Sequence, residues 1–287
     1  MKLVLAVVPL MGVLAGPAVA QSDATMESER AGVEAAARDY MEGALFTDAE
    51  RMARGVHPEL TKVVVGTNRE TGRQSLRYNT ASFLVEWCQS AGERMADIDK
   101  NVDVTVFDIG DSLATARAIG EPWYDFMQLA KINGEWRIIN VLWARNQLNA
   151  EDQTGVVPEA RDSANIIATA LNYIDGSFSG NAGRMESALH PELTKILLTY
   201  DRSTGNPFLH KMGASDLIEG TLAGLGMVPE AERDIEVDIQ DASHGIAAVK
   251  VMSSQYIDHL QMGKVNGEWK IINVLWVPNP DRPRRQG

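Results

Sequence analysis

The stretch "KINGEWRIINVLW" at residues 131–143 returns as "KVNGEWKIINVLW" at residues 264–276, with eleven of thirteen positions identical. Each copy holds an Asn-Gly pair between apolar runs, which predicts a tight β-hairpin because both residues accept positive φ. The same offset of 133 residues relates "HPELTK" at 57–62 to "HPELTK" at 190–195. A period of this length is a whole domain, so the sequence predicts two tandem copies of one fold.

The chain divides around these copies into five segments. The stretch between the copies is polar and rich in turn residues, and the last residues are basic and rich in proline, a composition that favours disorder. The expected segments are a signal peptide at 1–20, copy one at 26–147, a linker at 148–158, copy two at 159–280 and a disordered tail at 281–287.

The N-terminus has the pattern of a secretory signal peptide. Lys2 precedes an apolar run that ends in Ala18, Val19 and Ala20. We expect cleavage after Ala20 and a secreted, periplasmic protein. A retained anchor helix is the alternative, although the run is short for a membrane span. No later segment is apolar enough to cross a membrane, so no membrane contact is expected after cleavage.

The composition excludes some classes of partner. The 287 residues carry a formal net charge of −12, and an acidic surface repels phosphate backbones, so nucleic acid is not expected as a partner. The sequence contains no HxxxH, HExxH or CxxC spacing, and we therefore expect neither a metal site nor a cofactor.

Periodicity within copy one predicts an α+β domain. Apolar residues at helical spacing predict a helix over 33–44, and a second, short helix should end at His57 because the residue before a proline avoids helical geometry. Two short strands and a third helix after Asn79 follow. Four further strands, the last two joined by the Asn-Gly turn, complete a sheet whose two faces are both largely apolar.

The hairpin register decides which side chains share a face. Counting outward from the turn places Asp125 opposite Leu142 on one face and Tyr124 opposite Trp143 on the other. Because both faces are apolar, we expect helices to cover the first and the sheet of the other copy to cover the second. The two copies would then form an internal pseudo-dimer, with Trp143 and Trp276 packed between the domains.

The order of elements and the motifs "HPELTK" and "NGEWRIINVLW" resemble the lumazine-binding branch of the nuclear-transport-factor-2-like superfamily. The resemblance covers nearly all of each copy. It implies two cone-shaped domains, each with helices packed on a curved antiparallel sheet around a pocket. The superfamily includes ketosteroid isomerases, polyketide cyclases, dehydratases and binding proteins without chemistry, so the fold does not determine the function. The branch name implies a pterin-like ligand.

Two carboxylates stand out as candidate catalytic groups. Asp125 and Asp258 each lie within an apolar strand, where a carboxylate must be paired, hydrogen-bonded or neutral. Each could act as a general acid or base, or serve as a structural hydrogen-bond anchor. The wider set of candidate ligand-binding residues is Tyr40, His57, Trp123, Asp125 and Asn140 in copy one, and Tyr173, His190, Tyr256, Asp258 and Asn273 in copy two.

Each remaining candidate has a structural alternative. The tyrosines could stabilise an oxyanion, as a tyrosine on the equivalent helix does in ketosteroid isomerases, or could be core residues with a bonded hydroxyl. The histidines could touch a ligand or cap the preceding helix. Lys62 and Lys195 are expected in surface ion pairs with the nearby glutamates. Trp87 is replaced by Gly220 and Phe126 by His259, so the pockets or their rims should differ.

Three functions are compatible with these residues. The first is an exported protein that binds a small apolar or heteroaromatic ligand without turning it over. The second is an isomerase-like or cyclase-like enzyme that uses Asp125 or Asp258 with help from tyrosine and histidine. The third is an interaction protein whose pockets are filled by side chains.

Overall fold

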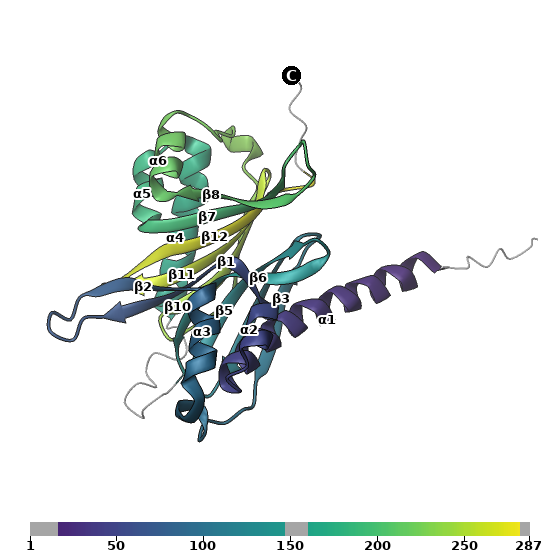
Figure 1. Ribbon diagram of the computed structural model, residues 1–287. Helices are drawn as coiled ribbons and strands as arrows, with labels where there is room; N and C mark the ends of the chain where they lie inside the picture. The colour runs from purple at the N-terminus through teal and green to yellow at the C-terminus, as the bar shows by residue number, and fades with distance from the viewer. Residues whose placement is uncertain (1–16, 147–159, 282–287) are drawn as a thin grey trace, which may run out of the picture.

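The computed structural model describes residues 17–146 and 160–281 (Figure 1). The predicted linker and most of the predicted tail and signal peptide lie outside these residues. The first domain consists of α1 (Pro17–Leu45), α2 (Ala49–Gly55), β1 (Val56–Thr67), β2 (Gln74–Thr80), α3 (Ala81–Ala91), η1 (Gly92–Met95), β3 (Asp103–Ile109), β4 (Leu113–Gly120), β5 (Trp123–Ile132) and β6 (Glu135–Arg145). The second consists of α4 (Ala160–Ser179), α5 (Ala182–Ala188), β7 (Leu189–Tyr200), β8 (Pro207–Gly213), α6 (Ala214–Leu222), η3 (Glu230–Glu232), β9 (Ile235–Ser243), β10 (Ile246–Ser253), β11 (Tyr256–Val265) and β12 (Glu268–Pro278).

Each domain is a six-stranded sheet with its helices on one face (Figure 1). The strand order is β2-β1-β6-β5-β4-β3 in the first sheet and β8-β7-β12-β11-β10-β9 in the second. All neighbours are antiparallel except β1 with β6 and β7 with β12, which are parallel. The predicted α+β class and the duplication are therefore confirmed.

The helices begin and end for local reasons. Asp48 caps α2 by accepting a hydrogen bond from the backbone N–H of Arg51 at 2.9 Å. The helix ends at Gly55, where a Cβ would lie 2.8 Å from the carbonyl oxygen of Ala36 in α1, so the close approach of α1 requires glycine. The predicted end at His57 is wrong by two residues, and His57 belongs to β1.

The first helix is longer than its apolar periodicity predicted. It begins at Pro17, four residues before the expected cleavage point, so its first turn falls within the predicted signal peptide. None of the helices in the described part of the chain is both long and apolar enough to span a membrane.

A β-bulge changes the predicted register of the central hairpin. Asn133 and Gly134 form the turn with φ values of 52° and 85°, as their sequence predicts. Beyond this turn, however, Gln128 pairs with Asn140, and Ile139 is the extra residue of β6. The same bulge recurs between β11 and β12.

The bulge moves the following side chains to the opposite face, because the side chains of a strand alternate. Asp125 consequently pairs with Trp143 instead of Leu142. Trp143 packs against the core beneath the helices, whereas Leu142 belongs to the cluster between the sheets. The prediction that Trp143 and Trp276 pack between the domains is therefore wrong, since Trp276 also packs against the core of its own domain.

The two sheets pack face to face as an internal pseudo-dimer. One apolar cluster between them joins Tyr124, Phe126 and Leu142 of the first domain to Ile246 and Ile272 of the second. Two reciprocal hydrogen bonds cross the interface: the Nε2 atom of Gln128 donates to the carbonyl oxygen of His259, and that of Gln261 to the carbonyl oxygen of Phe126, each at 2.8 Å. Because the two bonds join equivalent residues in opposite directions, they indicate an approximate two-fold axis between the domains.

Candidate ligand-binding site

Each domain contains a buried triad of tyrosine, aspartate and lysine beneath its helices. In the first domain the hydroxyl of Tyr40 on α1 donates to Oδ2 of Asp125 on β5 at 2.6 Å. The ammonium of Lys62 on β1 donates to the same carboxylate oxygen at 2.9 Å and to the Tyr40 oxygen at 2.5 Å. Three elements therefore meet at one carboxylate.

The second domain repeats this geometry. Tyr173 donates to Oδ1 of Asp258 at 2.9 Å, and Lys195 donates to the same oxygen at 2.8 Å and to the Tyr173 oxygen at 2.5 Å. Asp258 is fully buried, and 6% of Lys195 is exposed. Since a buried carboxylate needs a counter-charge, the lysine is what allows an aspartate to occupy this place in the core.

Burial and charge act together on the titration of the triad. Desolvation and the neighbouring Asp125 carboxylate hold the pKa of Tyr40 well above its ordinary value. Tyr173 has a raised pKa for the same two reasons, with Asp258 as its neighbour. Burial lowers the pKa of Lys62, and Asp125 opposes this effect. Both phenols therefore stay protonated at neutral pH and act as hydrogen-bond donors.

Aromatic rings surround each buried ammonium. The Nζ atom of Lys195 lies 4.5 Å from the ring centroid of Trp276 and 5.6 Å from that of Tyr256. The Nζ atom of Lys62 lies 4.7 Å from the Trp143 ring in the first domain. Electron-rich ring faces at this distance stabilise a cation that has lost its water. The β-bulge brings both tryptophans to this side of the sheet.

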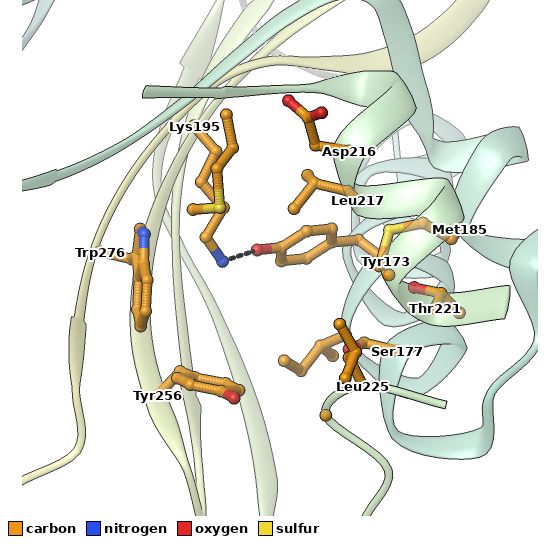
Figure 2. A pocket seen from close by; sticks show the side chains of 14 residues that line it. Tyr173, Ser177, Met185, Lys195, Asp216, Leu217, Thr221, Leu225, Tyr256 and Trp276 are labelled. Carbon is orange, nitrogen blue, oxygen red and sulfur yellow. Dashed lines mark hydrogen bonds between the residues drawn. The ribbon is translucent and has the colours of Figure 1, made fainter. Parts of the chain in front are cut away.

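A cavity of about 220 Å³ opens beside the triad of the second domain. Figure 2 shows Lys195 and Tyr173 meeting between the sheet and the helices, with Trp276 and Tyr256 on the side of the sheet and Leu225 on the side of the helices. The full lining is Tyr173, Ile174, Ser177, Met185, Lys195, Met212, Asp216, Leu217, Gly220, Thr221, Leu225, Gly226, Tyr256 and Trp276. The Asp258 carboxylate does not line this cavity, so the polar groups that a ligand meets include the ammonium of Lys195 and the phenol of Tyr173.

The structure brings some of the predicted site residues together and separates others. Tyr40, Asp125 and Trp123 lie around Lys62, and their counterparts Tyr173, Asp258 and Tyr256 lie around Lys195. Asn140 and Asn273 do not join them, and their predicted place in the cavity is wrong. Because of the bulge, the Nδ2 atom of each donates to a glutamine of the neighbouring strand at 2.8 Å, on the face between the domains.

The predicted histidines also lie apart from the triads. The Nδ1 atom of His57 accepts a hydrogen bond from the backbone N–H of Glu59 at 3.2 Å, and His190 repeats this contact with Glu192 at 3.1 Å. His57 lines a separate surface pocket formed with the β5–β6 turn. Burial lowers the pKa of both imidazoles, which favours the neutral form that this contact requires. This contact is structural, but it differs from the predicted helix cap, because each ring accepts from a backbone N–H of its own strand.

The lysines of the triads were assigned wrongly from the sequence. Lys62 and Lys195 are buried ion-pair partners of the aspartates and not surface residues. Their spacing in "HPELTKVVV" and "HPELTKILL" resembles that of an exposed strand position. The signal that could have found them is the requirement for a cation beside each buried carboxylate.

Comparison with known proteins identifies the family. A family model described as "Putative lumazine-binding" matches residues 28–144 and again residues 161–277. The chain belongs to this family. Each of its two domains matches the family model separately, and the family description supports a ligand-binding role for the fold. No match was found among curated proteins.

Solved structures of similar fold cover about one domain each. A nuclear-transport-factor-2-like protein of unknown function from Shewanella baltica is 14% identical, with 43% of this chain and 98% of that chain covered and a TM-score of 0.35. One from Methylobacillus flagellatus is 19% identical, with 44% and 98% covered and a TM-score of 0.35. One with a cystatin-like fold from Novosphingobium aromaticivorans is 14% identical, with 49% and 97% covered and a TM-score of 0.35.

Proposed function

We propose that this member of the lumazine-binding family holds one small, flat heteroaromatic molecule in the cavity of its second domain and does not turn it over. The observation that carries the proposal is the cavity itself, in which Trp276 and Tyr256 form an aromatic wall and Lys195 supplies a buried cation. A flat ring can pack against such a wall while the cation orients its polar edge.

The size of the cavity selects the ligand. A cavity of roughly 150 Å³ holds a benzene-sized molecule. The present cavity of about 220 Å³ therefore suits one ring or two fused rings. It is too small to enclose a steroid or a polyketide, the substrates of the enzymes that share this fold.

The polar side chains that line the cavity include Tyr173, Ser177, Lys195, Asp216 and Thr221, and among them Lys195 favours a ligand with hydrogen-bond acceptors. An ammonium has three N–H donors, and Lys195 uses two of them for Asp258 and Tyr173. The third can donate to a carbonyl oxygen or a ring nitrogen. A bicyclic compound with a carbonyl group or a ring nitrogen at its edge matches this donor.

The alternative of an isomerase-like enzyme receives less support from this geometry. A carboxylate that acts as a general base must reach its substrate. Asp258 is fully buried, forms an ion pair with Lys195, and does not line the cavity. A structural role in holding Lys195 and Tyr173 accounts for all of these contacts.

The proposal includes export, on the basis of the N-terminal pattern of Lys2, an apolar run and Ala18 to Ala20. The mature protein should then begin near Gln21. N-terminal sequencing of the protein isolated from outside the cytoplasm tests this step, and a mature chain that retains Leu3 to Leu14 contradicts it.

Titration with lumazine, a bicyclic heteroaromatic dione, tests the binding function. Isothermal calorimetry should give one equivalent bound, and Trp276→Leu should weaken binding at least tenfold. The matched control is Trp143→Leu, the same change at the equivalent position of the first domain, which should keep the affinity of the natural protein. Native mass spectrometry of the purified chain would identify the natural ligand. Absence of saturable binding by lumazine and by any co-purifying molecule would leave the interaction protein as the better account.

A further inference from the structure

The two domains differ at one helix position that faces the cavity. Gly220 of α6 lines the cavity of the second domain, and Trp87 of α3 stands at the equivalent position of the first. The Trp87 ring packs edge-on against Trp123, with 5.9 Å between ring centroids, and contacts the core of the first domain. Trp123 is the counterpart of Tyr256. The Trp87 indole thus reaches from α3 to the sheet. In the second domain, the cavity lies at the equivalent place.

The backbone does not require glycine at position 220. Gly220 lies inside α6 and does not have a positive φ. A Cβ added there would meet only Leu225, at an ordinary 3.8 Å. Because glycine weakens a helix interior relative to alanine, its presence costs stability for no local gain. What it provides is the open space of the cavity.

The segment that follows Gly220 carries exposed apolar residues, unlike the equivalent sequence of the first domain. Leu222, Leu225 and Met227 are exposed by 69%, 68% and 53%, and Leu225 lines the cavity. The equivalent positions carry Gln89, Gly92 and Arg94. An exposed apolar group beside a pocket is typical of a ligand entrance. These exposed apolar residues and the missing tryptophan therefore occur together, in the second domain.

We infer that Trp87 is a built-in occupant of the first domain and that its indole indicates the ligand class of the second, a flat bicyclic aromatic molecule of indole size. The ligand class rests on the proposed function, whereas the occupancy of the first domain by Trp87 does not. Duplication has thus produced one receptor domain and one domain that is closed by its own side chain. The residue at position 87 in the first domain, or at position 220 in the second, determines whether that domain can bind the ligand.

Indole itself is the probe for this inference. Equilibrium dialysis should give one indole bound by the natural chain and two by Trp87→Ala, which vacates the first domain without placing glycine in α3. Gly220→Trp should weaken indole binding at least tenfold, and Gly220→Ala far less. Trp87→Phe, which still fills the space, should bind one indole. The double variant Trp87→Ala, Gly220→Trp should again bind one, now in the first domain.

The outcomes separate this inference from the proposed function. A folded Trp87→Ala that binds no more indole than the natural chain overturns the inference and leaves the proposed function intact. If the natural chain binds no indole while Trp87→Ala binds one, the occupancy by Trp87 stands and the receptor role of the second domain fails. Should Trp87→Ala be unstable, indole should raise its Tm more than that of the natural chain. A folded Gly220→Trp that binds indole like the natural chain also contradicts the inference.

Discussion

At the scale of residues, each buried triad depends on a lysine that allows a carboxylate to lie in an apolar core. Lys62 pairs with Asp125 and Lys195 with Asp258, and each pair shares its contacts with a tyrosine. The aspartates and tyrosines could be selected from the sequence, because a charged or polar residue on an apolar face needs a hydrogen-bond or ion-pair partner. The lysines could not be selected by periodicity alone, since one charged residue in a short strand is typical of a solvent-facing position.

Removing one partner of such a pair should cost more than removing both. Lys62→Met leaves the Asp125 carboxylate buried without its counter-charge, which typically costs about 3–5 kcal/mol of unfolding free energy. The double variant Lys62→Met, Asp125→Asn removes the unpaired charge and should be destabilised by less than Lys62→Met alone. Urea denaturation at pH 7 measures both. Strictly additive effects would mean that the pair carries no coupling.

At the scale of elements, the β-bulge determines which face each side chain of β6 and β12 serves. The hairpin, its turn and the strand order around it follow from the Asn-Gly signal and from alternation. The position of the bulge does not, because "RIINVLW" is apolar on both faces and a shift of one residue leaves the pattern equally apolar. This single feature separates the predicted sites, which contained Asn140 and Asn273, from the observed ones, in which Trp143 and Trp276 lie beside the triad lysines.

The glutamine at each bulge should be essential for the interface. The Nε2 atom of Gln128 donates to the carbonyl oxygen of His259 and its Oε1 atom accepts from Asn140, each at 2.8 Å. Gln128→Leu removes both hydrogen bonds and leaves the buried Asn140 amide without this partner, at a cost of about 1–3 kcal/mol. Gln74→Leu removes an exposed contact between the domains and should change stability by less than about 0.5 kcal/mol. Equal effects in denaturation would contradict the account.

At the scale of the molecule, duplication has tethered two sheets that would otherwise need a second chain. The repeat predicts this arrangement from sequence because each sheet exposes a second apolar face. The partners of individual side chains across the interface were not predictable, since they depend on how two twisted sheets cross. His259 illustrates the point: it replaces Phe126, yet lies between the domains and not at the cavity.

The interface should weaken in acid because of His259. Burial lowers the pKa of this histidine from 6.5 to about 4, despite the opposing charge of Asp108, and Lys250 adds to the lowering. The unfolded chain takes up a proton below about pH 6.5 and the folded chain does not, so stability is lost as the pH falls toward 4. The difference in unfolding free energy between the natural protein and His259→Phe should change by roughly 3 kcal/mol between pH 7 and pH 4. Parallel stability curves would contradict this assignment.

The first domain should not persist alone as a monomer. A fragment of residues 21–150 exposes Tyr124, Phe126 and Leu142, which the second domain otherwise covers. We expect it to dimerise or aggregate, because a large exposed apolar patch favours association. In the whole chain, the covalent connection raises the effective concentration of the second domain to roughly millimolar, so the patch is covered within one molecule. Sedimentation over a range of concentrations measures this. A stable monomer at high concentration would mean that the domains associate only weakly.

The most direct test of the central claim, that a ligand occupies the second domain, is methyl NMR of the protein labelled at its methionines. Met185 and Met212 line the cavity beside Lys195, whereas Met41 and Met52 lie in the core of the first domain. On titration with lumazine, the signals of Met185 and Met212 should shift and saturate at one equivalent, while those of Met41 and Met52 stay in place. If the cavity methionines do not move, or if the methionines of the first domain shift equally, the claim is contradicted.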